Sequence, residues 1–457
     1  MKNSGLISFR AYGVLGEKIY EIDFTRDATI IVGPNGTGKS TFLSLFYLFV
    51  TQQWSRLQDY SFERLELTHE LGEVGIDFAT LQTYQEASSD STPVRRFAQR
   101  LRSEGLGDLL KKGSLNKEDR NRFSNAIGIP IDQVVPMFRY MQSEFSFSVG
   151  IQQVEETLSN FDLGTVVYLP TYRRIEKDIQ TIFPDIEDRF KKSIERSGAA
   201  QREGRNFVEI SGFGMSDIHA LINRAVDEVK EFRRASLESA YQEYIRDIVN
   251  GRIRKYSLTN LRSMSEDDFQ DFHERLNADI FTKSDQDTLS EKISKIRRKN
   301  SGQPTAEDRF LGMFVEQLID AHTRTKVQER NLFGFIEVIS RYLGPSKYAE
   351  FSAEVFRIRH ANSREPEDVR LEHLSSGEKQ IVALFAYLFL SKRKNMMVLI
   401  DEPELSLSVP WQKTFLPDIL GNEACVGIFA VTHSPFVFDN HLKDSVVDVR
   451  RLEVDHD

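Results

Sequence analysis

The segment of residues 33–40, with the sequence GPNGTGKS, constrains the fold of this chain more than any other feature. It matches the pattern G-x-x-x-x-G-K-[ST], follows the apolar residues 29–32, and leads into an apolar helix expected from Lys39 to about Trp54. Glycines let the backbone N–H groups of such a loop turn toward a phosphate, and the N-terminus of the following helix favours negative charge. A strand, a phosphate loop and a helix in this order predict an α/β nucleotide-binding fold.

Two side chains of this loop have chemical roles toward a nucleoside triphosphate. Lys39 can reach the β- and γ-phosphates, and the Ser40 hydroxyl can be a ligand of Mg²⁺. We therefore predict that ATP and Mg²⁺ are the cofactors. The residues expected to bind the nucleotide are Gly33, Pro34, Asn35, Gly36, Thr37, Gly38, Lys39, Ser40 and Thr41.

A second chemical feature is a pair of carboxylates after an apolar run. Residues 396–402 read MMVLIDE, which is typical of a strand buried on both faces that ends in Asp401 and Glu402. We expect Asp401 to hold Mg²⁺ together with Ser40, and Glu402 to be catalytic, because it can orient and activate the attacking water. An acid pair that only caps a strand at the surface is the alternative, and the phosphate loop in the same chain favours the catalytic interpretation.

The segment LSSGEKQ at residues 374–380 narrows the class of nucleotide-binding protein. It resembles the signature motif of ABC ATPases and precedes an apolar helix. Hydroxyls at Ser375 and Ser376, the Gly377 backbone and a helix N-terminus can form another anion site, although a plain helix cap explains the isolated segment nearly as well. The resemblance implies that this site contacts the γ-phosphate held by another subunit, so that two heads close around two nucleotides.

His433 follows the apolar residues 426–430 and resembles the switch histidine of the same family. The resemblance implies a catalytic role, in which a neutral imidazole bonds the γ-phosphate or the attacking water. Residues 402–408 resemble the D-loop, but Ser408 stands where relatives commonly carry histidine. The Q-loop glutamine is left open between Gln58, Gln82 and Gln85, and no adenine-stacking aromatic residue is assigned.

These motifs, with the opening pair Phe9 and Arg10, resemble the ABC-type ATPases of the RecF, OLD and Rad50-like group. The resemblance implies an ABC-type P-loop ATPase head, an α/β fold with a mixed β-sheet, interrupted by a large and mainly helical insertion. Residues 1–85 are expected to form the N-terminal part of the head, and residues 346–457 its C-terminal part with the signature, Walker B and switch histidine. Residues 86–345 form the predicted insertion, from which a strand near 165–169 returns to the head.

Short strands are expected at 6–11 and 18–24, in a hairpin of 62–68 with 74–78, and at 354–359 and 369–371. The clearest helix of the insertion begins near Ser216 and repeats apolar residues at helical spacing. This apolar seam packs either on a neighbouring helix of the same chain or on another subunit. Its members are Ile218, Ile222, Ala225, Val229, Phe232, Leu237, Tyr241, Tyr244 and Ile248.

Composition and charge limit the partners and the compartment. The formal net charge of -9 and the pI of about 5.7 argue against a surface wholly devoted to nucleic acid, although nucleic-acid binding is left open. Basic clusters at 95–102, 252–255 and 295–299 could follow a nucleic-acid backbone, but acids accompany each of them; Arg173 or Arg174 could face a phosphate. The single cysteine, Cys425, excludes an internal disulfide framework, and no apolar stretch is long enough to span a bilayer. We expect a cytoplasmic protein without membrane contact.

The leading functional prediction is an ATPase subunit of a two-gene, toxin–antitoxin-like anti-phage system. By whole-chain resemblance it is most similar to the ATPase of PARIS, which implies slow ATP hydrolysis, a homo-oligomer, and control of a separate effector nuclease of the TOPRIM type. An HNH nuclease, as with Septu or retron-associated ATPases, is the second choice, and a phage protein is the expected trigger. Because only residues 434–457 follow His433, we expect the nuclease to be a partner rather than a domain.

Other functions compete with this prediction. A RecF- or Rad50-like DNA-repair ATPase that closes on DNA is the main alternative, with the acidic net charge mildly against it. A transporter subunit is disfavoured, because the phosphate loop and the signature lie far apart in this sequence. A scaffold that uses ATP chiefly to hold an assembly together is a further alternative, and Glu402 favours hydrolysis.

Overall fold

Two compact units make up the chain in the computed structural model. Unit 1 comprises Met1–Gly214, Ser375–Leu384 and Lys392–Asp457, and unit 2 comprises Met215–Leu374 and Phe385–Ser391. The domain division expected from the sequence stays a prediction. The residues that the structure describes are 5–16, 18–82, 117–127, 130–170, 206–210, 215–259, 261, 282–298, 304–352, 354–361, 367–405 and 407–454.

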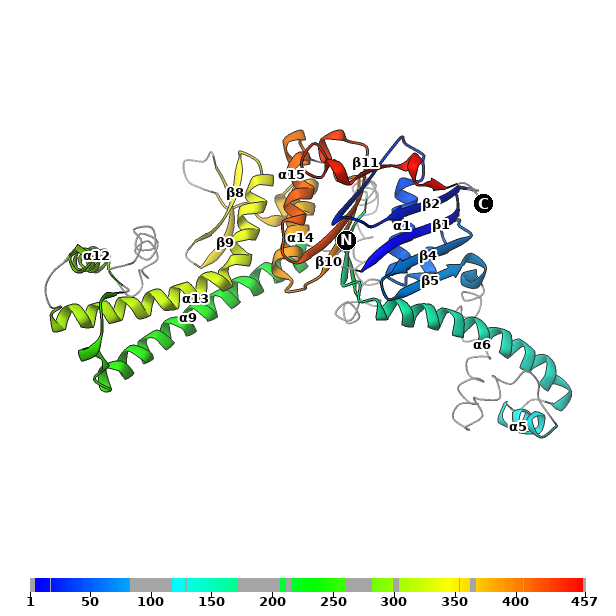
Figure 1. Cartoon of the computed structure of the whole chain (residues 1–457), viewed down its shortest axis with the longest axis horizontal. Helices are drawn as coiled ribbons and strands as arrows, with labels where there is room; N and C mark the ends of the chain where they lie inside the picture. Colours follow the sequence, from blue (N-terminus) through cyan, green and yellow to red (C-terminus); the bar gives the residue numbers. More distant parts are fainter. Residues whose placement is uncertain are drawn as a thin grey trace. The chain divides into compact units, whose positions relative to one another are not determined.

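Unit 1 contains an antiparallel sheet with the strand order β13-β2-β1-β4-β5 (Figure 1). β1 (Leu6–Val14) pairs with β2 (Lys18–Asp23) and with β4 (Arg64–His69), and β4 forms a hairpin with β5 (Gly72–Asp77). β13 (Glu453–Val454) pairs with the outer edge of β2. Buried and more exposed residues alternate along β4 and β5, as expected for a sheet with one covered face. The two early strands and the hairpin expected from the sequence are confirmed.

The second sheet of unit 1 pairs its strands in parallel, in the order β12-β3-β11-β10-β6-β7. β3 (Ala28–Val32), β10 (Met396–Asp401) and β11 (Cys425–Thr432) are central, and most of their side chains are buried. Burial on both faces explains why these segments are uninterrupted apolar runs. β6 (Thr165–Leu169) pairs with β10, and the outer strands are β7 (Phe207–Glu209) and β12 (Val446–Asp448). Together the two sheets confirm the predicted α/β fold class.

Helix α1 (Lys39–Val50) follows β3 and is buried on most of its surface in a core shared by the two sheets. The ring of its Phe46 lies 5.2 Å from that of Phe9 in β1 and 5.3 Å from that of Phe429 in β11. Packing on both sides explains the apolar sequence of this helix. The expected extension to Trp54 is wrong, because Gln52 adopts a left-handed φ of 57° and α2 (Trp54–Leu57) begins as a separate helix.

Further helices of unit 1 are α5 (Lys117–Ile127), α6 (Ile131–Asn160) and α15 (Val409–Leu420). Helix α14 (Ser376–Leu390) belongs to unit 1 as far as Leu384 and to unit 2 from Phe385. Short 3₁₀ helices follow β11: η6 (Pro435–Val437), which packs on α15, and then η7 (Lys443–Ser445) and η8 (Val449–Arg451). Within the described part of the chain, no helix is both long and apolar enough to cross a membrane.

Unit 2 is built on two long helices, α9 (Met215–Val249) and α13 (Ala306–Tyr342), which lie side by side (Figure 1). Arg233 of α9 donates to Glu329 of α13 at 2.6 Å. Ile218, Ile222 and Val229 of the apolar seam are buried, and α13 is the helix of the same chain on which α9 packs. The remaining helices described in this unit include η4 (Arg252–Lys255) and α12 (Lys283–Arg298).

A hairpin of β8 (Lys347–Ser352) and β9 (Val355–His360) follows α13 in unit 2. β9 confirms an expected strand, whereas β8 was not predicted from the sequence. The strand expected at 369–371 is wrong. Asp368 makes only an isolated bridge with Arg359, and the chain then turns at Arg370, whose carbonyl accepts the His373 N–H in η5 (Leu371–His373).

Candidate functional site

The loop of residues 33–38 connects the carboxyl end of β3 to α1. Gly36 and Gly38 adopt left-handed φ angles of 78° and 81°, and a Cβ on Gly38 would lie 2.9 Å from Leu15 Cδ1, so a larger residue would be strained there. Gly38 is also the N-cap of α1, and it supplies no side-chain acceptor to the first N–H groups of the helix. A phosphate bound in the loop can accept hydrogen bonds from those donors.

Lys39 is the buried cation of this loop, with 4% of its surface exposed. Its Nζ donates a hydrogen bond to the Pro34 carbonyl at 2.7 Å. Burial lowers the pKa of Lys39, and the negative charges of Asp401, Glu402 and Glu404 oppose this shift. An anion in the loop would give the ammonium group a stronger partner than a carbonyl and favour its charged form.

Ser40 and Asp401 bring the loop and the acid pair together. The Ser40 hydroxyl donates to Asp401 Oδ1 at 2.8 Å. Asp401 is the last residue of β10, and β11 separates β10 from β3 in the parallel sheet, so both carboxyl ends reach the same edge. A hydroxyl and a single carboxylate beside a phosphate loop form a donor set that fits Mg²⁺, which takes few protein oxygens and completes its shell with phosphate and water.

Glu402 follows β10 with a left-handed φ of 55°, a conformation that is uncommon outside glycine. Its N–H donates to the Val431 carbonyl of β11 at 2.8 Å, and its carbonyl accepts the Leu405 N–H at 3.1 Å. A backbone of this kind costs about 1–3 kcal/mol and persists where the surroundings hold it, often at functional sites. The half-buried residue lines a small cavity together with Gly377 and Gln380.

The signature segment forms the start of α14. The Ser375 hydroxyl accepts the Glu378 N–H at 3.3 Å, and Glu378 Oε2 accepts the Ser375 N–H at 2.8 Å. This reciprocal pair is a capping box, so the helix-cap interpretation describes the segment as it stands. Ser375 and Ser376 are exposed and Gly377 is buried. Their role as a second anion site stays a prediction.

His433 is exposed at the end of β11, and a third carboxylate holds its backbone. Glu404 accepts the His433 N–H at 2.8 Å and the Thr432 hydroxyl at 2.7 Å. No motif in the sequence predicted a role for Glu404. The signal in the sequence was a further acid two positions after Glu402, which by itself did not show which turn it contacts.

Two residues of the first hairpin were also missed as neighbours of the phosphate loop. The Tyr20 hydroxyl donates to the Thr37 carbonyl at 2.9 Å, and the exposed Leu15 lies beside Gly38. The turn between β1 and β2 therefore supports the loop from the antiparallel sheet. No local motif predicts this contact, because it depends on how the two sheets pack.

Several candidates from the sequence lie elsewhere. Gln58 donates to the Leu81 carbonyl at 2.5 Å, Gln82 is exposed, and Gln85 lies outside the described residues, so the Q-loop assignment stays open. Arg173, Arg174 and the cluster 95–102 also lie outside the described residues. In the other basic clusters, Arg252 pairs with Asp247 at 2.9 Å and Lys295 with Glu291 at 2.6 Å, as expected for solvated ion pairs.

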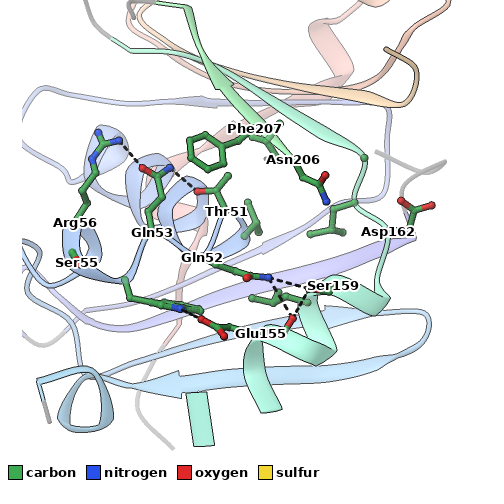
Figure 2. Close-up of a pocket in the computed structure, with 16 residues that line it drawn as sticks. Thr51, Gln52, Gln53, Ser55, Arg56, Glu155, Ser159, Asp162, Asn206 and Phe207 are labelled. Atoms are coloured by element: carbon green, nitrogen blue, oxygen red, sulfur yellow. Dashed lines mark hydrogen bonds between the residues drawn. The ribbon is translucent and has the colours of Figure 1, made fainter. Parts of the chain in front are cut away.

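A larger cavity of about 650 Å³ lies at the opposite end of α1 from the loop (Figure 2). Its polar side chains largely bond one another: Trp54 Nε1 donates to Glu155 at 2.7 Å, and Arg56 donates to Gln53 at 2.8 Å and to Glu209 at 2.6 Å. The cavity is lined by the C-terminal end of α1, where the helix dipole disfavours anions. The phosphate-binding features that the structure describes are therefore not in this cavity, although it is larger than the one beside Glu402.

The chain matches a family model and shows a low similarity to solved structures. A family model described as "AAA domain, putative AbiEii toxin, Type IV TA system" matches residues 96–439, a range that includes Asp401, Glu402 and His433. A solved structure of the Smc head domain with an extended coiled coil, bound to the C-terminal domain of ScpA and derived from Pyrococcus furiosus, is 13% identical, with a TM-score of 0.32. That match covers 95% of this chain and 90% of that chain. A second structure, the Smc head bound to the C-winged helix domain of ScpA, is 12% identical with a TM-score of 0.31, over 94% of this chain and 90% of that one. No curated protein matches the chain.

Proposed function

The chain belongs to the AAA-domain family whose model matches residues 96–439, and from this premise we propose that it binds Mg-ATP at residues 33–41 and hydrolyses the nucleotide to ADP and phosphate. The observation that carries the proposal is the 2.8 Å hydrogen bond between Ser40 and Asp401. It joins a phosphate loop to an acid at the end of β10, two places away from β3 in the parallel sheet, and this arrangement suits phosphoryl transfer.

Each side chain of the site has a defined part in this proposal. Lys39 binds the β- and γ-phosphates through Nζ, in place of its present carbonyl partner. Ser40 and Asp401 hold Mg²⁺, which neutralises charge on the phosphates when bound. The Glu402 carboxylate orients the attacking water and accepts its proton, and His433 donates to the γ-phosphate or positions this water.

We further propose that two copies of the chain complete each site. After β10, at the start of α15 and after β11, the apolar side chains of Leu405, Val409 and Phe436 are 42%, 43% and 40% exposed, which is typical of a surface that a partner covers. Lys413, one turn beyond Val409 on α15, has its Nζ 5.9 Å from the centre of the Phe436 ring, so Val409 and Phe436 belong to one surface. The capped N-terminus of α14 at Ser375–Gly377 of one copy then contacts the γ-phosphate bound to the other.

The variant Glu402→Gln tests this mechanism. It keeps the size of the side chain and removes the proton acceptor, so we expect ATP binding within about threefold of wild type and hydrolysis slowed by at least about 100-fold. Mass photometry with and without Mg-ATP should show that the variant accumulates an ATP-dependent oligomer. The matched control is Glu70→Gln, an exposed glutamate after β4. The assigned role would be contradicted if Glu402→Gln hydrolysed ATP at the wild-type rate. It would also be contradicted if Glu402→Gln and Lys39→Ala lost ATP binding to the same extent.

At the level of the cell, we propose that the ATPase assembles with and controls a separate effector nuclease in a toxin–antitoxin-like anti-phage system, as its resemblance to the PARIS ATPase suggests. The name of the matched family, which refers to a toxin and a type IV toxin–antitoxin system, supports this class of role. A TOPRIM-type nuclease is the proposed partner, with an HNH nuclease second, and a phage protein the proposed trigger.

Co-expression with the neighbouring gene tests the cellular role. We expect Glu402→Gln, purified with Mg-ATP, to retain a second protein in a large assembly, and the gene pair to protect bacteria from at least one phage. A nucleotide-dependent dimer without a second protein, together with salt-dependent DNA binding that requires ATP, would replace this role with DNA repair.

A further inference from the structure

Glu404 uses both oxygens of its carboxylate on the turn that carries His433. Oε1 accepts the backbone N–H of His433 at 2.8 Å, and Oε2 accepts the hydroxyl of Thr432 at 2.7 Å. Thr432 is fully buried, and its hydroxyl oxygen also accepts the Ser434 N–H at 3.0 Å. A carboxylate with two charge-assisted hydrogen bonds to adjacent residues holds this turn in one orientation.

The same contacts continue into the D-loop segment, residues 402–408. The Glu404 carbonyl accepts the Leu407 N–H at 3.2 Å, and the Leu407 carbonyl accepts Gln412 Nε2 at 3.0 Å. Gln412 Oε1 in turn accepts the Ser434 hydroxyl at 2.6 Å. Hydrogen bonds therefore form a closed ring between the D-loop segment and residues 432–434, with the Glu404 carboxylate on one side and Gln412 on the other.

The turn that carries Glu402 is tied to the same place. The Glu402 N–H donates to the carbonyl of Val431, the residue directly before Thr432, at 2.8 Å. The turn that carries Glu402 and Glu404 is thus bound to residues 431–433 in two ways. The Glu402 N–H bonds the Val431 carbonyl, and the Glu404 carboxylate bonds the His433 N–H. A shift of either turn must strain the bonds that hold the other.

We propose that Glu404 is a positioning residue that makes the Glu402 turn and the His433 turn move as one unit. This inference rests on the proposed ATPase function, because its consequence is that Glu402 is aligned for its water only while His433 engages the γ-phosphate. Both carboxylate oxygens of Glu404 bond the His433 turn. Its effect comes from alignment, where a displacement of about 1 Å can cost about 100-fold in rate.

Three substitutions in the full chain separate alignment from simple folding. In Glu404→Gln the amide oxygen can still accept the His433 N–H, but the amide nitrogen offers a donor where the Thr432 hydroxyl needs an acceptor. Thr432→Val removes that hydroxyl at nearly constant shape, and Thr432→Ser keeps it. Glu70→Gln, at an exposed position of the same unit, is the control.

We expect Glu404→Gln and Thr432→Val each to lower kcat by about 10- to 100-fold, with the dissociation constant of a fluorescent ATP analogue within about threefold of wild type. The double variant should be no slower than the slower single variant, since both changes break the same hydrogen bond between the Thr432 hydroxyl and Glu404. Thr432→Ser and Glu70→Gln should keep the wild-type kcat. A structural role alone would lower the melting temperature and leave kcat at low temperature unchanged, and that result would overturn the inference.

Hydrogen exchange in the nucleotide-free protein tests the contact without turnover. The backbone amide of His433 should exchange at least about tenfold faster in Glu404→Ala, which removes both acceptor oxygens, than in wild type or Glu70→Gln. Unchanged exchange would refute the inference even if the wild-type protein hydrolyses ATP. A wild-type protein that hydrolyses no ATP would instead refute the proposed function, and the exchange result would still decide whether Glu404 holds the His433 turn.

Discussion

The Ser40 hydroxyl and the Asp401 carboxylate, 361 positions apart in the chain, form a hydrogen bond of 2.8 Å. Ser40 lies in the first turn of α1, and Asp401 ends a strand two places away from β3 in the parallel sheet. Their contact is possible because β3, β11 and β10 run in parallel, which brings the carboxyl ends of β3 and β10 to the same edge of the sheet.

Removal of the Ser40 hydroxyl should weaken nucleotide binding only when Mg²⁺ is present. We expect Ser40→Ala to raise the dissociation constant of ATP at least about tenfold in Mg²⁺ and to leave it unchanged in excess EDTA, because one metal ligand is lost. Isothermal titration under the two conditions measures this difference. Ser44→Ala, one turn further along α1, is the matched control, since the Ser44 hydroxyl only approaches that of Tyr168, at 3.5 Å. Equal affinities of Ser40→Ala and wild type in Mg²⁺ would contradict the proposed Mg²⁺ site.

Removal of the Lys39 ammonium group should abolish nucleotide binding with or without the metal ion. Lys39→Ala deletes the buried cation that faces the phosphates, so we expect the affinity for ATP to fall by at least about 100-fold. Lys394→Ala, at an exposed position before β10, removes the same charge from the surface and should bind ATP normally. Fluorescent-nucleotide titration of the two variants makes the comparison. ATP binding by Lys39→Ala within tenfold of wild type would place the nucleotide elsewhere.

Because Cys425 is the single cysteine of the chain, the rate at which its thiol is alkylated reports on the folding of unit 1. Burial raises the pKa of the Cys425 thiol to about 12, so at pH 8.5 the native protein should react with iodoacetamide at least about 100-fold more slowly than the unfolded chain, in which the thiol has its usual pKa of about 8.5. The raised pKa also predicts the sign of the pH dependence. The stability that it contributes is complete below about pH 8.5 and is lost as the pH rises toward 12.

Alkylation rates, measured by mass spectrometry in buffer and in urea, check the Cys425 prediction. Cys425→Ser is the control, because it leaves no thiol in the chain and should show no modification at cysteine. Similar rates in the native and unfolded states would show that the half-buried thiol at the start of β11 is as accessible and as ionised in the native protein as in the unfolded chain.

The ion pair of Arg233 with Glu329 should contribute to the stability of unit 2 alone. Arg233→Ala leaves the buried Glu329 carboxylate without this partner, at a cost of about 2–3 kcal/mol in the free energy of unfolding. The control Lys230→Ala removes a surface pair with Asp227, with atoms 3.8 Å apart, and should cost less than about 1 kcal/mol.

Two spectroscopic signals separate the units in this experiment. Both tryptophans, Trp54 and Trp411, lie in unit 1, whereas the long helices α9 and α13 lie in unit 2. In urea, Arg233→Ala should shift the helical circular-dichroism transition and leave the tryptophan-fluorescence transition in place. A shift of the fluorescence transition instead would show that the pair does not act within unit 2.

The sequence by itself determined the parts of this protein that depend on neighbours along the chain. The phosphate loop, the apolar run of β10 and the polar residues that follow each strand are local patterns, so the α/β class and the positions of β3, α1, β10 and β11 could be predicted. Errors occurred where local signals were weak. Helix α1 ends early at the left-handed Gln52, β8 has no clear alternation, and η5 replaced an expected strand.

Only the tertiary structure decided which of these residues meet. The contact of Ser40 with Asp401, the support of Thr37 by Tyr20, and the two bonds from Glu404 to the His433 turn all join segments that are distant in sequence. Such contacts depend on the order of the strands and on the packing of two sheets around α1. The distances between motifs in the sequence predict neither of these. The contact of Glu404 with the His433 turn therefore depends on β10 and β11 being neighbours in the sheet.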